Sequence, residues 1–270
     1  MSLNFNDINI SVNSQNIMCE SISLDQQSPQ KPAYILNSSR PLDNIPQGLK
    51  HSLNMSYYLE PGNEPNYAII TGWKNDVTGN LKATLNLGRI QFTGYLSNYS
   101  FNLTPNNAVM AQATYQIYEP LTGNFYQSNS TGDSLLYNLQ NSDGIAHYWS
   151  AEMTSGDYVT IPNNNIIQLD YSWNSSIIPH YKLGNSLPCQ ISCVEANEEI
   201  NLTNEIQNNP TFLEQSYDII FNDIDNIRLK DMSSINHIDF CLSGFVAQTN
   251  KANIAVNQMI VYSHNLSKSY

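Results

Sequence analysis

Apolar and polar residues alternate with a period of two along much of this chain. In the run 53–59, Leu53, Met55, Tyr57 and Leu59 fall on one side and polar or smaller residues fall on the other. Such alternation is typical of a strand with one packed and one hydrated face. The other predicted packed positions are Leu81, Ala83, Leu85 and Leu87; Tyr95, Ser97, Tyr99, Phe101 and Leu103; Val109, Ala111, Ala113, Tyr115 and Ile117; and Ile167, Leu169, Tyr171 and Trp173.

The pattern predicts a mainly β protein with antiparallel sheets and very little helix. One short helix is expected over 67–70, with Asn66 as its N-cap. A second is expected over 211–221, directly after Pro210. Turn-forming Pro, Gly and Asn residues separate the strands. The stretch 123–147 has the weakest pattern and is interpreted as a linker or an inserted loop.

A ten-residue motif occurs twice. Residues 32–41 and 179–188 share Pro, Tyr, Leu, Ser and Pro at the same spacing, at an offset of 147. Near the ends of the two halves, Ala111 matches Ala255 at an offset of 144. Each half also repeats the order strand, Pro/Tyr loop, strand, helix and strand pair. We therefore predict a tandem duplication of one β unit.

The duplication predicts two antiparallel β-sandwich or barrel domains, each with one short flanking helix. The first domain covers residues 1–122 and the second covers residues 158–270, with residues 123–157 as the linker or inserted loop. The run Glu195–Glu199 is expected to interrupt the strand that follows the loop in the second half.

Each half resembles the tail-tube fold of tailed bacteriophages over about 100 residues. Three features carry the resemblance: the Pro-x-Tyr-x-Leu loop at Pro32, Tyr34 and Leu36, the strand 53–60, and the terminal hairpin over 94–115. The resemblance implies a non-enzymatic virion structural protein, namely a tail-tube, baseplate-hub or tail-adaptor component. Such a protein would be assembled in the host cytoplasm and reside in the virion.

The resemblance also implies the partners. The chain would pair its sheet edges with further copies and form a trimeric or hexameric ring, which also contacts other virion proteins. Three copies of a doubled domain can form a pseudo-sixfold ring, as in baseplate hubs. Six copies can use one domain for the tube and the other as an outer layer. Two other readings stay open: a capsid decoration or neck protein, and a carbohydrate-binding host-recognition module that uses Trp149 and Trp173.

The charge balance changes what the chain can bind. Its 270 residues include 11 Lys and Arg against 23 Asp and Glu, which gives a net charge of −12. Affinity for nucleic acid requires cations that neutralise phosphates, so this composition argues against a DNA-binding protein. An acidic, amide-rich lumen could still let DNA pass without binding it.

Compartment signals are weak. No apolar run of 18 residues occurs, so we expect no membrane-spanning helix. Residues 1–6 lack the features of a secretory signal. The four cysteines, Cys19, Cys189, Cys193 and Cys241, are too few for a disulfide framework in a chain of this length. We expect a protein made in a reducing cytosol.

Residues that could carry chemistry do not form a recognisable site. No Gly-rich phosphate loop occurs, and the five His residues lack metal-ligand spacing. Cys189 and Cys193 would lie about 13 Å apart on a strand, too far for one metal, and are expected to be buried thiols. Adjacent strand residues point to opposite faces, so Glu198 and Glu199 cannot act as a catalytic pair and are interpreted as a turn.

Two further candidates have ordinary explanations. The run 223–226 lacks the Gly and Glu of a calcium loop and is expected to be solvated. The three Trp residues, Trp73, Trp149 and Trp173, are expected to pack in the core rather than to form a sugar-binding platform. The sequence therefore predicts no catalytic, cofactor-binding or metal-binding residue.

Overall fold

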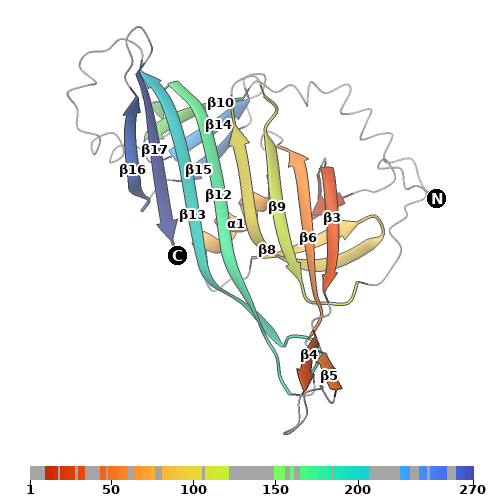
Figure 1. Ribbon diagram of the computed structural model, residues 1–270. Helices are drawn as coiled ribbons and strands as arrows, with labels where there is room; N and C mark the ends of the chain where they lie inside the picture. The colour runs from red at the N-terminus through yellow and green to blue at the C-terminus, as the bar shows by residue number, and fades with distance from the viewer. Residues whose placement is uncertain are drawn as a thin grey trace.

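The computed structural model describes 10–17, 19–27, 30–33, 43–46, 48–59, 64–76, 81–104, 107–121, 149–155, 159–160, 165–183, 185–206, 226–231, 237–241, 244–253 and 260–270. This part of the chain is mainly β, its sheets are antiparallel, and it contains one helix, α1 (Pro65–Asn75) (Figure 1). The predicted class is confirmed at this level. The predicted helix over 211–221 lies outside the described residues.

The strands before residue 122 are β1 (Ile10–Val12), β2 (Gln15–Asn16), β3 (Cys19–Gln27), β4 (Gln30–Ala33), β5 (Asp43–Pro46), β6 (Lys50–Tyr58), β7 (Lys82–Leu87), β8 (Ile90–Leu103) and β9 (Met110–Ile117). Those after it are β10 (Trp149–Ser155), β11 (Val159–Thr160), β12 (Asn165–His180), β13 (Gln190–Ile206), β14 (Asn226–Asp231), β15 (His237–Cys241), β16 (Val246–Asn253) and β17 (Ile260–Ser269). The strand β10 thus lies inside the segment predicted to be a linker or loop.

One long sheet organises the molecule. Its strands follow the order β3-β6-β9-β8-β12-β13-β17-β16, and each neighbouring pair is antiparallel. The pairing of β8 with β12 joins the first half of the chain to the second. Within the described residues, the edge strands β3 and β16 do not pair with each other, so the sheet is open and the chain alone forms no closed barrel.

The second layer covers one face of the long sheet (Figure 1). The first part of β8 pairs with β7 and leads to β1 and β2, while its second part belongs to the long sheet. A four-stranded sheet in the order β11-β10-β14-β15 and the helix α1 complete this layer. Ring contacts join the layers: Tyr67 of α1 packs on Tyr171 of β12, and Phe240 of β15 packs on Phe101 of β8.

The predicted strand faces are largely confirmed, because apolar residues of β6, β7, β9 and β12 are buried in this interlayer core. Tyr95 and Ile167 are exceptions, since both are half-buried, and Ile167 lies at the register shift between Ile166 and Gln168. Leu96, next to Tyr95, is fully buried. A β-bulge between Leu96 and Asn98 inserts one residue and shifts the phase of the alternation. Period two alone cannot locate such a bulge.

Two sequence predictions about local structure are wrong. The run Glu195–Glu199 does not interrupt a strand or form a turn, because β13 continues through it to Ile206. The N-cap of α1 is Glu64, whose side chain accepts a hydrogen bond from the backbone N–H of Asn66, and Asn66 lies inside the helix. The helix also extends to Asn75, well beyond the predicted 67–70.

The same strand register recurs in both halves of the chain at an offset of 147. Leu24 of β3 faces Leu53 of β6, and Tyr171 of β12 faces Ile200 of β13. The register shift of β3, between residues 19 and 21, recurs in β12 between residues 166 and 168. The offset seen in the Pro/Tyr motif therefore holds residue by residue through four strands.

The last two strands of each half also share a register, at an offset of 151. Tyr115 of β9 faces Leu53, and Leu266 of β17 faces Ile200. The bulge of β8 between residues 96 and 98 recurs in β16 between residues 247 and 249. The offset of 144 predicted for this region is therefore wrong, since it rested on chance identities such as Ala111 with Ala255.

Candidate functional site: a polar sheet face between two free edges

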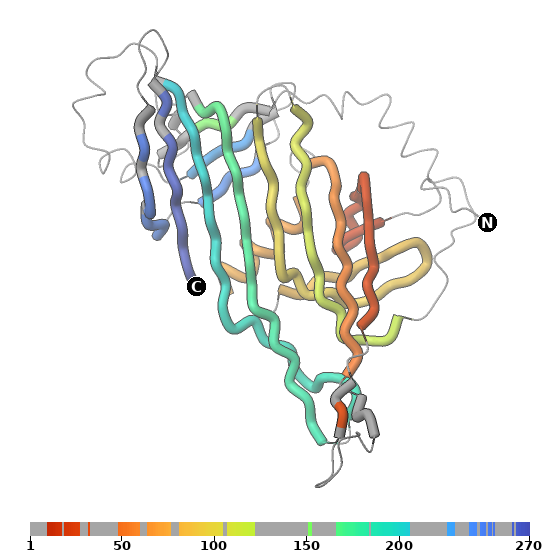
Figure 2. The backbone as a smooth tube through the Cα atoms, viewed as in Figure 1, coloured from red at the N-terminus to blue at the C-terminus, as the bar shows by residue number. Residues whose placement is uncertain are grey.

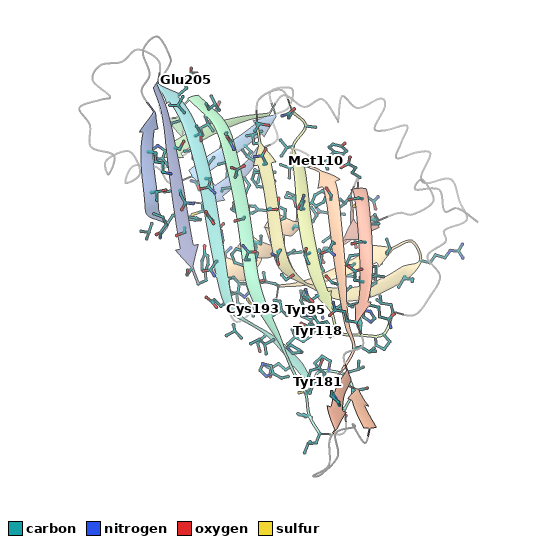
Figure 3. All side chains as sticks on the ribbon, viewed as in Figure 1. Tyr95, Met110, Tyr118, Tyr181, Cys193 and Glu205 are labelled. Carbon is teal, nitrogen blue, oxygen red and sulfur yellow. The ribbon has the colours of Figure 1, made fainter. Side chains whose placement is uncertain are left out.

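The long sheet has a polar face, defined as the face opposite α1. Rows of amide and carboxylate side chains cross it (Figure 3). In one row, Asn102, Asp170, Asn201 and Asn265 face one another on four adjacent strands. Asn102 donates to Asp170, and Asn265 Nδ2 donates to Asn201 Oδ1 at 2.6 Å. These side chains satisfy one another, as expected for a cross-strand ladder.

A second row lies four residues further along the same four strands. Asn98 Nδ2 donates to Asn174 Oδ1 at 2.7 Å, and Ser269 Oγ donates to Asn197 Oδ1 at 2.6 Å. A shallow groove of about 280 Å³ on this face is lined mainly by polar residues, with Asp170 as its charged group. The described part of this face is therefore hydrated and fixed by its own hydrogen bonds.

The charge on the polar face is negative at its centre. On the described parts of β9, β12, β13, β17 and the second half of β8, the acidic residues of this face are Asp170, Glu195, Glu199 and Glu205. These parts contain no arginine, and their one lysine, Lys268, pairs in register with the inward-facing Glu198. A surface of this kind repels phosphate groups.

Among the described strands, none pairs with the outer side of β3 or of β16, the two edges of the long sheet. β3 has nine residues and contains neither Pro nor Lys, and β16 has eight residues with one lysine, Lys251. Natural proteins usually protect a free edge by shortening it or by placing Pro or Lys along it. Long edges with little such protection favour pairing with another chain.

Apolar side chains also gather on the hairpin formed by β12 and β13, which extends past the end of the sheet (Figure 2). Tyr181, Leu183 and Leu187 are exposed near its tip. Tyr181 lies at the opposite end of the molecule from Glu205 (Figure 3) and packs against Gly48. The left-handed φ of +41° at Gly48 and the nearby Tyr181 ring favour glycine at this position.

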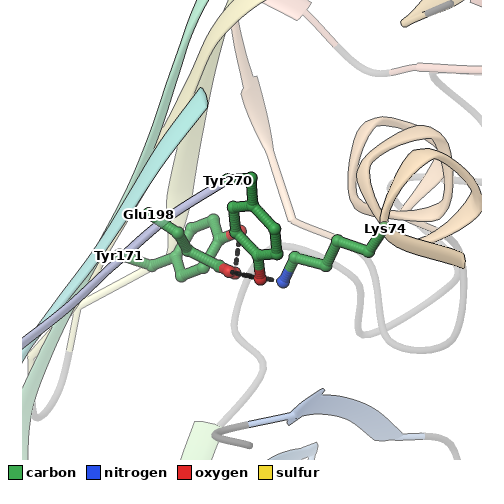
Figure 4. A network of polar contacts seen from close by, with 4 residues as sticks. All are labelled: Lys74, Tyr171, Glu198 and Tyr270. Atoms are coloured by element: carbon green, nitrogen blue, oxygen red, sulfur yellow. Dashed lines mark hydrogen bonds and ion pairs between the residues drawn. The ribbon is translucent and has the colours of Figure 1, made fainter. Parts of the chain in front are cut away.

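A buried carboxylate, Glu198, connects the two halves of the chain under the sheet (Figure 4). Lys74 of α1 lies 2.5 Å from Glu198 Oε1, and the hydroxyl of Tyr171 donates to the same oxygen at 2.7 Å. The hydroxyl of Tyr270 donates to Glu198 Oε2 at 2.9 Å. Burial lowers the pKa of Lys74, while the charge of Glu198 opposes that shift.

This cluster is packed within the core. Glu198 is 1% exposed, and the rings of Tyr67, Trp173 and Tyr270 lie around the Lys74 ammonium. Sequence reasoning missed it, because the interacting residues are separated by up to 196 positions. The local signal in the sequence was that Glu198 occupies an inward position of an alternating strand. Because this run was interpreted as a turn, the signal was overlooked.

A second buried carboxylate, Glu64, caps α1 beneath the first half of the sheet. The hydroxyl of Tyr57 donates to Glu64 Oε1 at 2.6 Å, and Asn66 Nδ2 donates to the Tyr57 hydroxyl at 2.6 Å. Tyr115 donates to Asn66. Burial raises the pKa of Glu64 from 4.5 to about 7, and the hydrogen bond from Tyr57 opposes this shift.

The residues weighed as chemical candidates lie apart. Cys189 is exposed and Cys193 is half-buried against the edge of the core, so the prediction of two buried thiols is wrong. Both lie on the hairpin of β12 and β13, which extends past the end of the sheet (Figure 2). Among the described residues, no group of His, Cys, Asp and Glu could hold a metal ion. Residues 223–225 of the rejected calcium motif lie outside the described residues.

Two of the three tryptophans lie in the described core. Trp73 and Trp173 are buried and pack on each other, as the core interpretation predicted. Trp149 begins β10, and its side chain lies outside the described part of the structure. The proposed sugar-stacking role of Trp173 is therefore wrong, because the ring is covered by α1 and Tyr270.

No helix among the described residues is both long and apolar enough to cross a membrane. No family model matches the sequence, and neither does any curated protein.

Proposed function

We propose that this chain is a non-enzymatic structural protein of a bacteriophage virion that forms a ring by pairing the edges of its long sheet. The ring would be a tail-tube, baseplate-hub or tail-adaptor component. The observation that carries the proposal is the long sheet itself, with one polar face and two open edges. Closing such a sheet between copies would satisfy the unpaired backbone groups of both edges.

The repeated register supports a duplicated unit. The first four strands of the long sheet, β3-β6-β9-β8, and the last four, β12-β13-β17-β16, follow the same order and carry bulges at matching positions. In our proposal each set belongs to one tail-tube-like unit. The domain division at residues 1–122, 123–157 and 158–270 stays a prediction, as does the trimeric or hexameric symmetry.

The polar face suits a lumen. In a closed ring, one face of the sheet would line the channel and the other would carry the second layer. The face opposite α1 has amides and carboxylates at its centre, so DNA could pass without being held by ion pairs. In this proposal the net charge of −12 allows DNA to pass through the ring without being bound.

Assembly of the purified full-length chain tests the proposal. We expect rings of three or six copies in electron micrographs, and a matching mass by sedimentation at high protein concentration. A chain that stays monomeric at every concentration would contradict the proposed function. Rings with another copy number would retain edge pairing and reject the proposed symmetry.

A further inference from the structure

The chain contains one completed contact between its two sets of four strands, the pairing of β8 with β12. On the polar face of this contact, Ser100 faces Ser172 and Asn98 faces Asn174. On the packed face, Phe101 faces Tyr171, which is 2% exposed. This contact shows how the last strand of one set meets the first strand of the next.

The two offsets identify the residues of the free edges that are equivalent to those of the β8–β12 contact. The offset of 147 relates β3 to β12, and therefore Asp25 to Ser172. The offset of 151 relates β8 to β16, and therefore Ser100 to Lys251. Since Ser100 faces Ser172 inside the chain, the same geometry between two copies would place Lys251 opposite Asp25.

We propose that β16 of one copy pairs antiparallel with β3 of a second copy in this register, with Lys251 directly opposite Asp25. The same register sets Thr249 opposite Gln27 and Asn253 opposite Ser23. This inference rests on the proposed function and deepens it, because it specifies the partner strand, the direction and the pairing residues of the contact between copies.

Strand direction agrees with the proposal. The long sheet has eight strands, and every neighbouring pair is antiparallel, so β3 and β16 run in opposite directions. When two copies are placed side by side in the same orientation, β16 of one is therefore antiparallel to β3 of the next. The new contact repeats the direction of the β8–β12 contact.

Charge and burial are complementary across the proposed contact. Asp25 and Lys251 are both exposed, and neither takes part in the ion pairs seen in the described part of the chain. Opposite charges at directly facing positions stabilise strand pairing. Leu24 is half-buried at the free edge, whereas its equivalent Tyr171 is covered by β8. A second copy would cover Leu24 in the same way.

Cysteine cross-linking tests the register. In full-length protein carrying Cys189→Ser and Cys241→Ser, the variant Asp25→Cys/Lys251→Cys should form disulfide-linked chains of two or more copies under mild oxidation. The matched control is Ser21→Cys/Lys251→Cys. It places the second thiol on the same face but four residues away, about 13 Å along the strand, which is too far for a disulfide.

Charge reversal provides an independent readout. Asp25→Lys and Lys251→Asp should each weaken assembly about three- to tenfold per contact, because attraction becomes repulsion. The double variant should restore assembly to near the wild-type level. Both side chains are exposed, so each variant should fold as the wild type does, which circular dichroism and thermal unfolding of the dilute protein would verify.

The outcomes separate this inference from the proposed function. If rings form but Asp25→Cys/Lys251→Cys gives no cross-link, the proposed register is wrong. The same holds if Ser21→Cys/Lys251→Cys cross-links equally well. In both cases the proposed ring would still stand. Failure of the double charge variant to recover assembly would also overturn the register. A chain that never assembles would overturn the proposed function and this contact together.

Discussion

Glu198 and Glu199 are adjacent in sequence and differ completely in environment. Glu198 is buried and accepts hydrogen bonds from Tyr171 and Tyr270, whereas Glu199 lies on the polar face and accepts hydrogen bonds from Asn201 and Asn265. The strand geometry makes the difference, because neighbouring side chains point to opposite faces. A buried charge is tolerated only where a partner such as Lys74 lies next to it.

Replacing Glu198 should therefore be costly. We expect Glu198→Ala to lower the free energy of unfolding by about 3–5 kcal/mol, because Lys74 would be left buried without a counter-charge. Urea unfolding would measure this change. Glu199→Ala is the matched control and should cost about 1 kcal/mol or less. Equal losses for the two variants would contradict the role assigned to the buried pair.

Glu64 makes stability depend on pH. Its pKa is raised from 4.5 to about 7, so the folded state keeps this proton over a range in which the unfolded state releases it. The contribution of Glu64 to the free energy of unfolding is most favourable below pH 4.5 and decreases as the pH rises from 4.5 to 7. Above pH 7 it stays constant, about 3 kcal/mol less favourable than below pH 4.5.

Glu64→Gln tests this dependence, since an amide keeps an oxygen to accept from Tyr57 and cannot ionise. We expect the variant to be more stable than the wild type at pH 8 and similar to it at pH 4.5, as measured by urea unfolding at both values. A wild-type pH profile that the substitution leaves unchanged would show that Glu64 does not titrate in this range.

Among the secondary-structure elements, β8 and α1 each contain one glycine, and the two glycines have different surroundings. Gly94 lies in β8, where an added Cβ would clash with Leu85 and would lie 3.0 Å from a ring carbon of Tyr115. Gly72 lies in α1, where an added Cβ would meet nothing within 4 Å. The same residue type thus has a packing role in the strand and none in the helix.

These two glycines should respond to alanine in opposite ways. Gly94→Ala should destabilise the fold by about 1–3 kcal/mol through overpacking. Gly72→Ala should stabilise it by about 0.5–1 kcal/mol, because alanine is the better helix former. Thermal unfolding of the two variants would show whether their shifts differ in sign, and a shift of the same sign would contradict the packing derived for β8.

At the scale of the whole molecule, the long sheet is complete at its centre and open at both ends. Leu24 of β3 shows the consequence, since it is half-buried although its equivalent Tyr171 is buried. In the proposed ring a neighbouring copy covers it. A charge at this position would be tolerated in a single copy, because a lysine can extend toward water, but not in the assembly.

Leu24→Lys should therefore give a folded monomer in which ring assembly is lost. Sedimentation and circular dichroism would measure assembly and folding separately. Leu183→Lys places the same change on the exposed hairpin tip, which belongs to neither edge strand, and should assemble as the wild type does. Normal rings from Leu24→Lys would exclude β3 as a contact edge.

The pattern of apolar and polar residues was enough to predict the class of the fold and most of the packed faces of its strands. Period-two alternation placed Leu53, Tyr115 and Tyr171 in the core, because burial of apolar side chains acts locally along each strand. The repeated Pro/Tyr motif also gave the offset of 147, and the strand register of β3 and β12 reproduces it. Such a repeat can be recognised from the linear sequence.

Which strands are neighbours could not be predicted from the sequence pattern and is known from the three-dimensional structure. The pairing of β8 with β12, the bulge at Leu96–Asn98 and the burial of Glu198 beside Lys74 depend on contacts between distant residues. Backbone hydrogen bonds between strands do not depend on the identity of the side chains. The sequence pattern therefore predicts which face of a strand is packed, but it does not predict which strand lies next to it. For the same reason, the open edges at β3 and β16 became visible only once every other strand had its neighbour.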